Sequence, residues 1–471
     1  MYFARSFRYS RRVGTNFFQE FISRFDGEGT FKCGCGQTHR IGTREVLFSA
    51  GALKDSAALL ARDYGGGARI WVLSDENTEA AAGDMWKSCV RGARISARVL
   101  PGHPRVVPTE ELVANLTEHV RSVSPDLLVA VGSGVISDLV KRVSLGVDIP
   151  NWCVATAASV DAYSSATSAI ETNGFHTALP ARVSRAIICD LDVIARAPRE
   201  MFLAGLGDLL AKYLAFLDWN LSRIVTGEHY CPVVSATALE SARSALAAAR
   251  KLDDDPGEAV RTLTDAALSS GFAMQALGSS RSAASVEHTM AHLWETADAV
   301  RNERLDLHGI LAGAASRIVL HGYRALYTRL ETFRPDISAR LGAYALEAPW
   351  QDSMEEGLQP FIAKVREEMA GRQFDRDILA ERLHAFINGK TEILGLARSM
   401  LDELAAAVDT LEGMSYPFSP TTLGIKAEFL LLPFRNARLL RLRYTGCDLA
   451  YELGLENILA DAGADYVKAM G

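Results

Sequence analysis

The sequence predicts an α/β amino-terminal domain of the Rossmann-like type, with a parallel sheet, followed by an all-α carboxyl-terminal domain. Two observations carry this prediction. Up to about residue 195, short apolar runs alternate with helical patterns, which is typical of parallel βαβ units with helices on both faces of the sheet. After Pro198, long Ala- and Leu-rich helical patterns dominate and strand-like runs become rare. We therefore expect one domain over residues 1–197 and a second over residues 198–471.

Five strands are expected in the first domain, each a short apolar run bounded by turn residues: Ala68–Leu73, Ile95–Leu100, Asp126–Val131, Asn151–Ala155 and Ala186–Cys189. Helical patterns cover Thr78–Ala93 and Glu110–Ser124 between them. The second domain is expected to contain long helices, clearest over Glu240–Lys251, Ser285–Ala299 and Asp377–Leu411. Turn signals rich in Asp, Pro and Gly separate these helical patterns.

Length, composition and charge exclude several classes of protein. The 471-residue chain is 48% hydrophobic and 23% charged, so it can bury a sizeable core and is not mainly disordered. A net charge of −7 disfavours a nucleic-acid binder, because such proteins need Lys and Arg to neutralise phosphates. No run of about 18 apolar residues exists, so no membrane-spanning helix is expected. The seven cysteines are odd in number and widely spread, which predicts free thiols in a reducing cytoplasm.

The amino-terminal segment is basic and aromatic up to its first acidic residue, Glu20. Its arginines are Arg5, Arg8, Arg11 and Arg12. This composition allows a transit peptide, but a basic arm that packs on the body of the protein or on a partner subunit is favoured. The sequence is compatible with a homo-oligomer and does not specify one.

A glycine turn after the apolar run Val129–Val131 is the sharpest local pattern in the first domain. Gly132, Ser133 and Gly134 follow the run, and a helix is expected to begin there. Glycines let a ligand approach the backbone, and the N–H groups of a helix start can bind phosphate. The six-residue Rossmann fingerprint is incomplete, because no third glycine follows at the required spacing. The motif alone leaves a phosphate site and a turn without a ligand as equal alternatives.

Asp75 directly follows an earlier buried strand. A carboxylate at this place can accept hydrogen bonds from a ribose diol and would repel a 2′-phosphate, so it favours NADH over NADPH. For this residue alone, a turn or helix N-cap aspartate is the simpler interpretation.

Three of the ten histidines fall within 21 residues: His288, His292 and His308. His288 and His292 are four residues apart in a helical pattern and therefore share one face, although no zincin HExxH motif is present. Asp208 lies in an apolar helical stretch, where a carboxylate is costly to bury unless it is paired or metal-bound. Together they indicate a metal site, with core histidines and an N-cap aspartate as the alternatives.

Cys33, Cys35 and His39 are spaced like a metal knuckle. A structural zinc site needs four ligands, and this stretch has three, with no second pair of such ligands elsewhere in the sequence. A glycine-rich hairpin with free thiols is therefore the favoured interpretation.

Taken together, these segments resemble one family. The chain is similar to the bacterial branch of the sn-glycerol-1-phosphate dehydrogenases, within the group that contains dehydroquinate synthases and iron-dependent alcohol dehydrogenases. The similar segments run in family order from about residue 30 to residue 456: Cys33–His39, Ser74–Thr78, Gly132–Lys141, Ala155–Ser165, Ala186–Asp192, Ala204–Lys212, Gly278–Glu295, His308–Gly309 and Asn436–Thr445. Each segment is weak alone, and the set is specific.

The resemblance implies roles for individual residues. The implied metal ligands are Asp208, His288 and His308. The implied cofactor-binding residues are Asp75, Gly132, Ser133, Gly134, Thr156, Ser159 and Ser165. Asp161 and His292 are the implied substrate-binding and catalytic residues. The implied activity is the reduction of dihydroxyacetone phosphate, or a similar phosphorylated ketone, to sn-glycerol 1-phosphate for phospholipid metabolism. It would use NADH or NADPH and one divalent metal, Zn²⁺, Ni²⁺ or Fe²⁺.

The chain departs from the family's pattern around the expected cofactor. Residues other than the usual Thr, Asn and Pro stand at Val135, Ser137 and Ser282. In the loop after the fourth expected strand, two prolines and a glycine are replaced by Ala155, Ala158 and Ala162. Prolines stiffen a loop, so we expect a looser cofactor or substrate loop here. We expect metal chemistry to be retained, with cofactor preference and substrate less constrained.

An aspartate with two histidines is a catalytic type of ligand set, because three protein ligands leave a position open for water or substrate. A metal there would polarise the ketone oxygen, and the nicotinamide would deliver the hydride. His292 would contact a substrate hydroxyl or relay its proton, and Asp161 would hold the hydroxyls. The candidate cations for the substrate phosphate are Arg281, Lys141 and Lys212.

Two other functions stay open. One is a sugar-phosphate cyclase similar to dehydroquinate synthase, although such enzymes usually have Glu at the first metal position, where this chain has Asp208. The other is a non-catalytic nucleotide-binding relative, which the altered loops allow and the retained ligand set argues against. A dehydrogenase for another phosphorylated or phosphonylated ketone would use the same site.

Overall fold

The computed structural model describes residues 8–9, 16–172, 174–300, 307–343, 358, 361–371, 375–420 and 422–470. The chain forms two compact units. The first contains the chain up to Thr172, together with His176–Leu209 and Pro232–Ser280. The second contains Asn173–Phe175, Leu210–Cys231 and Arg281–Gly471. The domain boundary expected near residue 197 stays a prediction.

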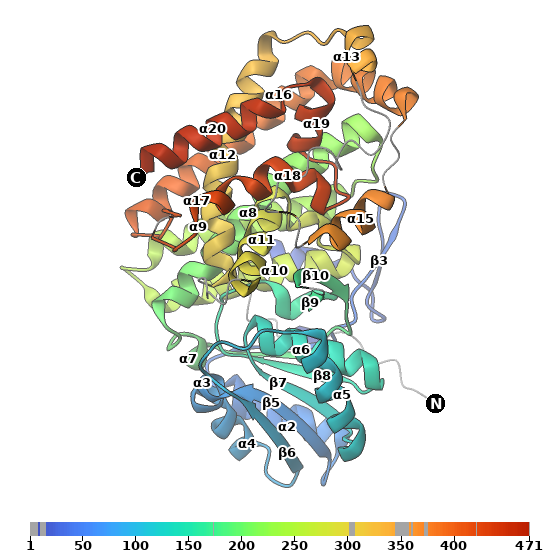
Figure 1. Ribbon diagram of the computed structural model, residues 1–471. Helices are drawn as coiled ribbons and strands as arrows, with labels where there is room; N and C mark the ends of the chain where they lie inside the picture. The colour runs from blue at the N-terminus through green and yellow to red at the C-terminus, as the bar shows by residue number, and fades with distance from the viewer. Residues whose placement is uncertain are drawn as a thin grey trace. The chain divides into compact units, whose positions relative to one another are not determined.

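The first unit is built on a seven-stranded sheet with the strand order β1–β4–β11–β8–β7–β5–β6. Strands β5, β6, β7 and β8 of this sheet are labelled in Figure 1. All neighbouring pairs with a recorded register are parallel. In chain order the strands are β1 (Arg8–Tyr9), β4 (Glu45–Ser49), β5 (Arg69–Asp75), β6 (Arg94–Leu100), β7 (Leu127–Gly132), β8 (Asn151–Ala155) and β11 (Ala186–Asp190). The five predicted strands are β5, β6, β7, β8 and β11, with ends that differ by at most two residues. The sequence analysis missed β4, whose residues alternate between buried and half-buried positions in place of one continuous apolar run.

Helices cover both faces of this sheet, as predicted. Successive side chains of a strand point to opposite faces. Ile70 and Val72 of β5 belong to a core cluster with residues of α2 (Ala52–Tyr64) and α4 (Asp84–Cys89). Trp71 and Leu73 belong to another cluster, with residues of α5 (Glu110–Val123) and α6 (Gly134–Val147). This is the doubly covered parallel sheet that the alternating pattern indicated.

The expected helix over residues 78–93 is divided in the structure. It forms α3 (Glu76–Thr78), a π-helical turn (Glu79–Gly83) and α4, and it ends before β6. The helix expected over residues 110–124 is α5. The remaining helices of the first unit are α1 (Asn16–Ser23), α7 (Leu191–Ile194), α9 (Pro232–Lys251) and α10 (Pro256–Leu277).

Two small antiparallel hairpins complete the first unit's secondary structure. One pairs β2 (Thr30–Lys32) with β3 (Thr38–Arg40), and it confirms the hairpin predicted around the Cys33–His39 motif. The other pairs β9 (Thr167–Thr172) with β10 (Phe175–Pro180) and was not predicted. A short 3₁₀ turn, Ala162–Ser164, precedes β9.

The second unit is helical, and no strand follows β11 among the described residues, as the sequence predicted for the carboxyl-terminal part. Helix α8 (Arg199–Thr226) begins in the first unit and continues unbroken into the second. The other helices are α11 (Val286–Val300), α12 (His308–Thr332), α13 (Ile337–Ala343), α15 (Ile362–Ala370), α16 (Arg376–Gly413), α17 (Ala427–Leu430), α18 (Leu432–Leu440), α19 (Gly446–Leu453) and α20 (Glu456–Met470). One of its cores joins Leu293 of α11, Val365 and Met369 of α15, and Leu439 of α18.

Two further expectations concern membrane-spanning helices and the basic amino-terminal segment. Among the described residues, no helix combines the length and the apolar character that crossing a membrane requires. Of the basic amino-terminal segment, Arg8 lies in β1, which pairs with β4. Arg5, Arg11 and Arg12 lie outside the described residues.

Candidate active site

The residues expected to bind the cofactor lie at the carboxyl ends of neighbouring strands. Gly132 ends β7, and Gly134 begins α6, so the predicted order of strand, turn and helix is present. Thr156 follows β8, which pairs with β7, and its N–H donates to the Gly132 carbonyl at 3.2 Å. Asp75 ends β5, the neighbour of β7 on its other side. The carboxyl edge of an open parallel sheet is the usual ligand-binding edge of such folds.

The two glycines of the turn are required by close packing. A Cβ on Gly132 would lie 2.7 Å from the Cβ of Ile136, in the first turn of α6. A Cβ on Gly134 would lie 3.0 Å from Val160. Ser133 is the N-cap residue of α6, yet its side chain makes no capping hydrogen bond. The helix start therefore presents backbone N–H groups at a narrow turn, which is the arrangement that suits a phosphate group.

Asp75 is the N-cap of α3, as its simpler interpretation predicted. Its Oδ1 accepts the Thr78 N–H at 2.8 Å, and Thr78 Oγ1 accepts the Asp75 N–H at 3.0 Å, which completes a capping box. The cap fixes the Asp75 carboxylate at the strand end, where the resemblance implies a ribose contact.

The far end of the loop after β8 is held by a buried lysine. Lys141 of α6 is fully buried, pairs with Asp138 at 2.9 Å, and donates to the Ala162 carbonyl at 2.8 Å. Its Nζ also lies 3.2 Å from Oγ of Ser165, so Ser165 belongs to this network. Lys141 therefore anchors the loop, and the expectation that it binds the substrate phosphate is not supported.

The same loop packs directly on α8 and α10. A Cβ on Gly205 of α8 would lie 1.9 Å from the Ala158 carbonyl oxygen, and one on Gly271 of α10 would lie 2.4 Å from that of Asp161. Thr156 and Ser159 are buried in the loop. The sequence analysis gave neither glycine a role, because close approach between segments so far apart leaves no local signal. A looser loop, expected from the missing prolines, stays a prediction.

Asp161 is tied to the predicted metal ligand Asp208. The Asp161 N–H donates to Oδ2 of Asp208 at 3.0 Å, and Ser270 Oγ donates to the Asp161 carboxylate at 2.6 Å. Asp208 lies well inside α8 and is 2% exposed, so the alternative that it caps a helix is wrong. A carboxylate buried in a helix interior needs such partners or a cation.

Asp208, His288 and His308 converge as a group of metal-ligand type. Each offers one ligand atom, and these atoms all lie within 4.8 Å of one another. His288 comes from α11 and His308 is the first residue of α12, as the helical patterns predicted. The carboxylate and the two imidazoles suit Zn²⁺, Ni²⁺ and Fe²⁺ alike.

Each histidine of this region has a carboxylate at its Nδ1 atom. Nδ1 of His288 lies 3.0 Å from Glu287, and Nδ1 of His308 lies 3.0 Å from Oε1 of Glu295. Nδ1 of His292 lies 3.1 Å from the other oxygen of Glu295. A histidine that donates its Nδ1–H to a carboxylate presents the Nε2 lone pair, which is the usual support of a metal-binding imidazole. The sequence analysis gave Glu287 and Glu295 no role.

His292 lies one turn from His288 on α11, with its ring stacked on that of His308 at 4.8 Å between centroids. Burial lowers the pKa of His292 to about 3, and repulsion from His308 and Arg441 acts in the same direction, against the attraction of Glu295. The ring is therefore neutral near pH 7.

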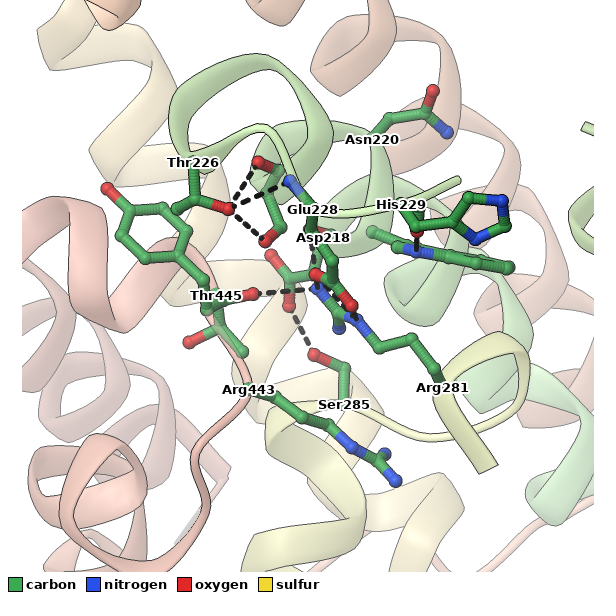
Figure 2. A network of polar contacts seen from close by, with 12 residues as sticks. Asp218, Asn220, Thr226, Glu228, His229, Arg281, Ser285, Arg443 and Thr445 are labelled. Carbon is green, nitrogen blue, oxygen red and sulfur yellow. Dashed lines mark hydrogen bonds and ion pairs between the residues drawn. The ribbon is translucent and has the colours of Figure 1, made fainter. Parts of the chain in front are cut away.

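Arg281 is committed to a buried polar network of the second unit (Figure 2). Its guanidinium binds both oxygens of Glu228 at 3.0–3.2 Å and donates to the backbone carbonyl of Asp218 at 3.1 Å. A third donation goes to the Tyr444 carbonyl at 2.9 Å. With its donors so engaged, Arg281 is a poor phosphate candidate. Lys212, the third candidate, is fully buried in α8.

Other arginines of the second unit line a cavity of about 560 Å³. Among them are Arg441 and Arg443, between α18 and α19. Burial lowers the pKa of both, to about 9 for Arg443. Figure 2 shows the Arg443 side chain turned away from the Glu228–Arg281 pair. These two residues belong to a segment that the resemblance includes, but no local sequence pattern marks them as anion-binding groups.

Known proteins resemble this chain in sequence and in fold. Residues 47–198 match the family model described as iron-containing alcohol dehydrogenase. A glycerol-1-phosphate dehydrogenase (NAD(P)+) of Geobacillus thermodenitrificans (strain NG80-2) is 32% identical over 202 residues, which are 43% of this chain and 50% of that protein. One of Geobacillus stearothermophilus is 29% identical over 303 residues, 63% of this chain and 74% of that protein. The first match thus spans only half of the relative's length.

The structure of a probable glycerol dehydrogenase from Sinorhizobium meliloti 1021 superposes with a TM-score of 0.58, over 92% of this chain and 99% of that one. Their sequences are 16% identical, so this likeness shows the fold alone. The family model, several relatives near 30% identity and the fold agree. Together they support a place for this chain among the glycerol-1-phosphate dehydrogenases, which it resembles over part of its length, within the group of iron-containing alcohol dehydrogenases.

Proposed function

We propose that this protein is a metal-dependent reductase that uses NADH or NADPH to convert dihydroxyacetone phosphate, or a similar phosphorylated ketone, into sn-glycerol 1-phosphate. The observation that carries the proposal is the convergence of Asp208, His288 and His308, with a carboxylate at the Nδ1 atom of each histidine. Three ligands of this kind leave one position open, which distinguishes a catalytic site from a closed structural one.

A divalent metal held by Asp208, His288 and His308 would polarise the ketone oxygen of the substrate. Glu287 and Glu295 lie at Nδ1 of the two imidazoles, which would leave both Nε2 atoms to hold the metal. The Asp161 N–H holds Oδ2 of Asp208 and so fixes the carboxylate. Asp208 is buried and both histidines are half-buried, so the ligand set would stay accessible to a substrate.

We assign His292 and Asp161 to the substrate. With its Nδ1–H donated to Glu295, His292 presents Nε2 as the atom that holds a substrate hydroxyl and exchanges a proton with it. Asp161 is fixed by Ser270, and its carboxylate is the group we propose for the remaining hydroxyl. Both residues thereby position the substrate at the open side of the metal ligands.

We assign the cofactor to the carboxyl edge of the sheet. The turn of Gly132, Ser133 and Gly134 would receive the pyrophosphate, with Thr156 and Ser159 beside it and Asp75 at the ribose. Ser165 is the seventh residue assigned to cofactor binding. When bound, the nicotinamide supplies the hydride. The Asp75 carboxylate supports a preference for NADH, because it would repel a 2′-phosphate.

For the phosphate of the substrate we propose Arg441 and Arg443 in place of Arg281 and Lys141. Both are half-buried residues that line a cavity, where an arginine interacts strongly with a dianion. Arg441 is also close enough to His292 to affect its pKa, so a phosphate at Arg441 would lie near the proposed substrate groups.

The test is an assay of purified protein with dihydroxyacetone phosphate that follows the absorbance of NADH or NADPH, with and without a chelator. We expect steady NADH oxidation that the chelator stops and added Zn²⁺, Ni²⁺ or Fe²⁺ restores. Turnover that the chelator leaves unchanged would contradict the metal assignment. A cyclic product from a heptulosonate phosphate with NAD would instead establish the sugar-phosphate cyclase.

We further propose a reducing, cytoplasmic location, which the absence of any disulfide among the seven cysteines supports. A small phosphorylated metabolite is the proposed partner, and no nucleic acid is expected at a net charge of −7. A homo-oligomer is compatible with this function, and light scattering behind a sizing column would measure it.

A further inference from the structure

The β2–β3 hairpin carries three metal-ligand side chains, two in its turn and one on β3. Its turn is closed by the Cys33 N–H, which donates to the Gln37 carbonyl at 2.9 Å, and by the Gly36 N–H, which donates to the Cys33 carbonyl at 3.1 Å. Gly36 has a φ of +89°, which favours glycine at this place. Cys33 and Cys35 thus project from the turn, and His39 projects from β3.

The fourth ligand is Cys231, which the sequence could not connect with the hairpin. Cys231 is bonded to Pro232, the first residue of α9, and its side chain is fully buried. The three sulfur atoms and one imidazole nitrogen of Cys33, Cys35, His39 and Cys231 all lie within 4.8 Å of one another. The sequence favoured a hairpin with free thiols over a metal site because only three ligands were visible, and the structure supplies a fourth.

The geometry of the group fits a tetrahedral zinc ion. Zinc–sulfur and zinc–nitrogen bonds of about 2.3 Å and 2.0 Å give ligand-to-ligand distances of about 3.5–3.8 Å around a tetrahedron. Sγ of Cys35 lies 3.4 Å from Nε2 of His39. We propose that Cys33, Cys35, His39 and Cys231 form a closed structural zinc site, separate from the metal site of the proposed reaction.

His39 is prepared for this role by its surroundings. Its ring is almost completely buried, and Nδ1 lies 3.0 Å from the Ala276 carbonyl of α10. A carbonyl can only accept, so Nδ1 carries the hydrogen and Nε2 directs its lone pair at the sulfur atoms. This is the backbone-supported arrangement of a metal-binding histidine.

Zinc at this site would fix more than the hairpin. The Gly42 N–H, just after β3, donates to Oε1 of Gln275 at 2.6 Å. Gln275 in turn donates to the Ser164 carbonyl at 2.7 Å, in the loop proposed to bind cofactor and substrate. The carbonyl of Ala276, the next residue, accepts the Nδ1–H of His39. The zinc site therefore lies at the end of α10 that also holds this loop, and its loss should loosen both.

The experiment measures zinc by mass spectrometry after treatment with EDTA, in a His288→Ala background that disables the other metal site. We expect about one zinc per chain in that background and none once Cys35→Ser or Cys231→Ser is added. Cys89→Ser, at a half-buried cysteine outside the group, and Cys447→Ser, at a buried one, are the matched controls and should keep the zinc. Cobalt-loaded protein should show intense thiolate-to-cobalt absorption that Cys35→Ser removes.

Because Cys35 lies at the hairpin tip, its variant tests the proposal even if Cys231→Ser fails to fold. The proposal would be overturned by zinc-free protein in the His288→Ala background, by equal zinc in Cys35→Ser and Cys89→Ser, or by a disulfide among these cysteines in protein purified under reducing conditions. Since the readout is metal content, none of these outcomes depends on the proposed reaction.

Discussion

Two groups of metal-ligand side chains among the described residues differ in the number of ligands, in their softness and in the groups that support them. Asp208, His288 and His308 are three nitrogen and oxygen ligands, each held on a helix, whereas the hairpin group offers three thiols and one imidazole. In the first group, carboxylates support the imidazoles. In the second, a backbone carbonyl supports His39. Three ligands leave room for a substrate, and four close the site.

This difference indicates that similar ligand residues can serve catalysis at one site and the stability of the fold at another. Carboxylates behind the imidazoles increase their basicity and place negative charge near the metal, which tunes a reactive ion. The neutral carbonyl at Nδ1 of His39 fixes the tautomer and orientation of the ring without adding a negative charge near the metal. The rigid helices α8, α11 and α12 hold the first group, as a precise catalytic site requires. The second group instead joins a small hairpin to a helix end, where a metal supplies stability that so short a hairpin lacks.

The largest effect on activity is expected for His288→Ala, which removes a ligand of the proposed catalytic metal. Removing one of three ligands should lower kcat/KM by at least about a thousandfold, since the metal is proposed to supply several kcal/mol of transition-state stabilisation. His384→Ala, at an exposed histidine of α16, is the control and should retain full activity. Unchanged turnover in His288→Ala would remove the catalytic metal from the account.

The network around Asp218 can be compared with both metal-ligand groups, because it is a buried polar cluster that needs no metal. Ser285, Tyr323 and the Gly446 N–H donate to its carboxylate. Even so, burial raises the pKa of Asp218 to about 7, against these bonds and the nearby Arg281. The folded state therefore holds a proton that the unfolded state releases near pH 4, so Asp218 stabilises the fold below that pH and this contribution is lost as pH rises through 7.

Urea unfolding of the wild type and of Asp218→Asn measures this effect. The free energy of unfolding of the wild type relative to the variant should fall by up to about 4 kcal/mol between pH 4 and pH 7. A difference that is constant with pH would mean that the carboxylate is ionised throughout, stabilised by its donors.

Glu295→Gln tests whether carboxylate support distinguishes the first metal group. The variant keeps the size of the side chain but loses the charge that faces Nδ1 of both His292 and His308. We expect a loss of about 10–100-fold in metal affinity, with activity restored by excess metal. A Glu403→Gln variant on α16 is the matched control. Equal metal affinity in the two variants would count against the proposed support.

The smallest effect is expected for Gly205→Ala, which separates the loop from the metal. The new Cβ would overlap the Ala158 carbonyl and push the loop away from α8, at a cost of about 1–3 kcal/mol in the free energy of unfolding. The KM for NADH should rise while the metal content stays the same. Gly395→Ala, where a Cβ on α16 meets nothing within 4 Å, is the control. Loss of metal in Gly205→Ala would show that the loop and the metal site are not separable.

Local patterns were sufficient for much of the fold. The buried strands of a parallel sheet are continuous apolar runs, so β5, β7 and β8 could be predicted within two residues of their ends. The i and i+4 spacing likewise placed His288 and His292 on one helix face. The strands β4 and β9 could not be predicted in this way, because their residues alternate between buried and half-buried positions and form no continuous apolar run.

The sites were harder to predict because they depend on contacts between distant segments. The resemblance supplied Asp208, His288 and His308, and the fold brings their ligand atoms together. No local pattern connects Cys231 with the hairpin, since the pairing exists only once α9 packs on α10 and the hairpin on the end of α10. Glu295 illustrates the same point, because its role appears only when α11 and the start of α12 meet.

The most direct measurement is anomalous diffraction from crystals of the zinc-loaded protein. We expect an anomalous peak for zinc about 2.0–2.2 Å from the ligand atoms of Asp208, His288 and His308. Substrate or water would occupy its fourth position. A peak missing from this group, or a metal held there by four protein side chains, would contradict the central claim that an open, catalytic metal site operates in this protein.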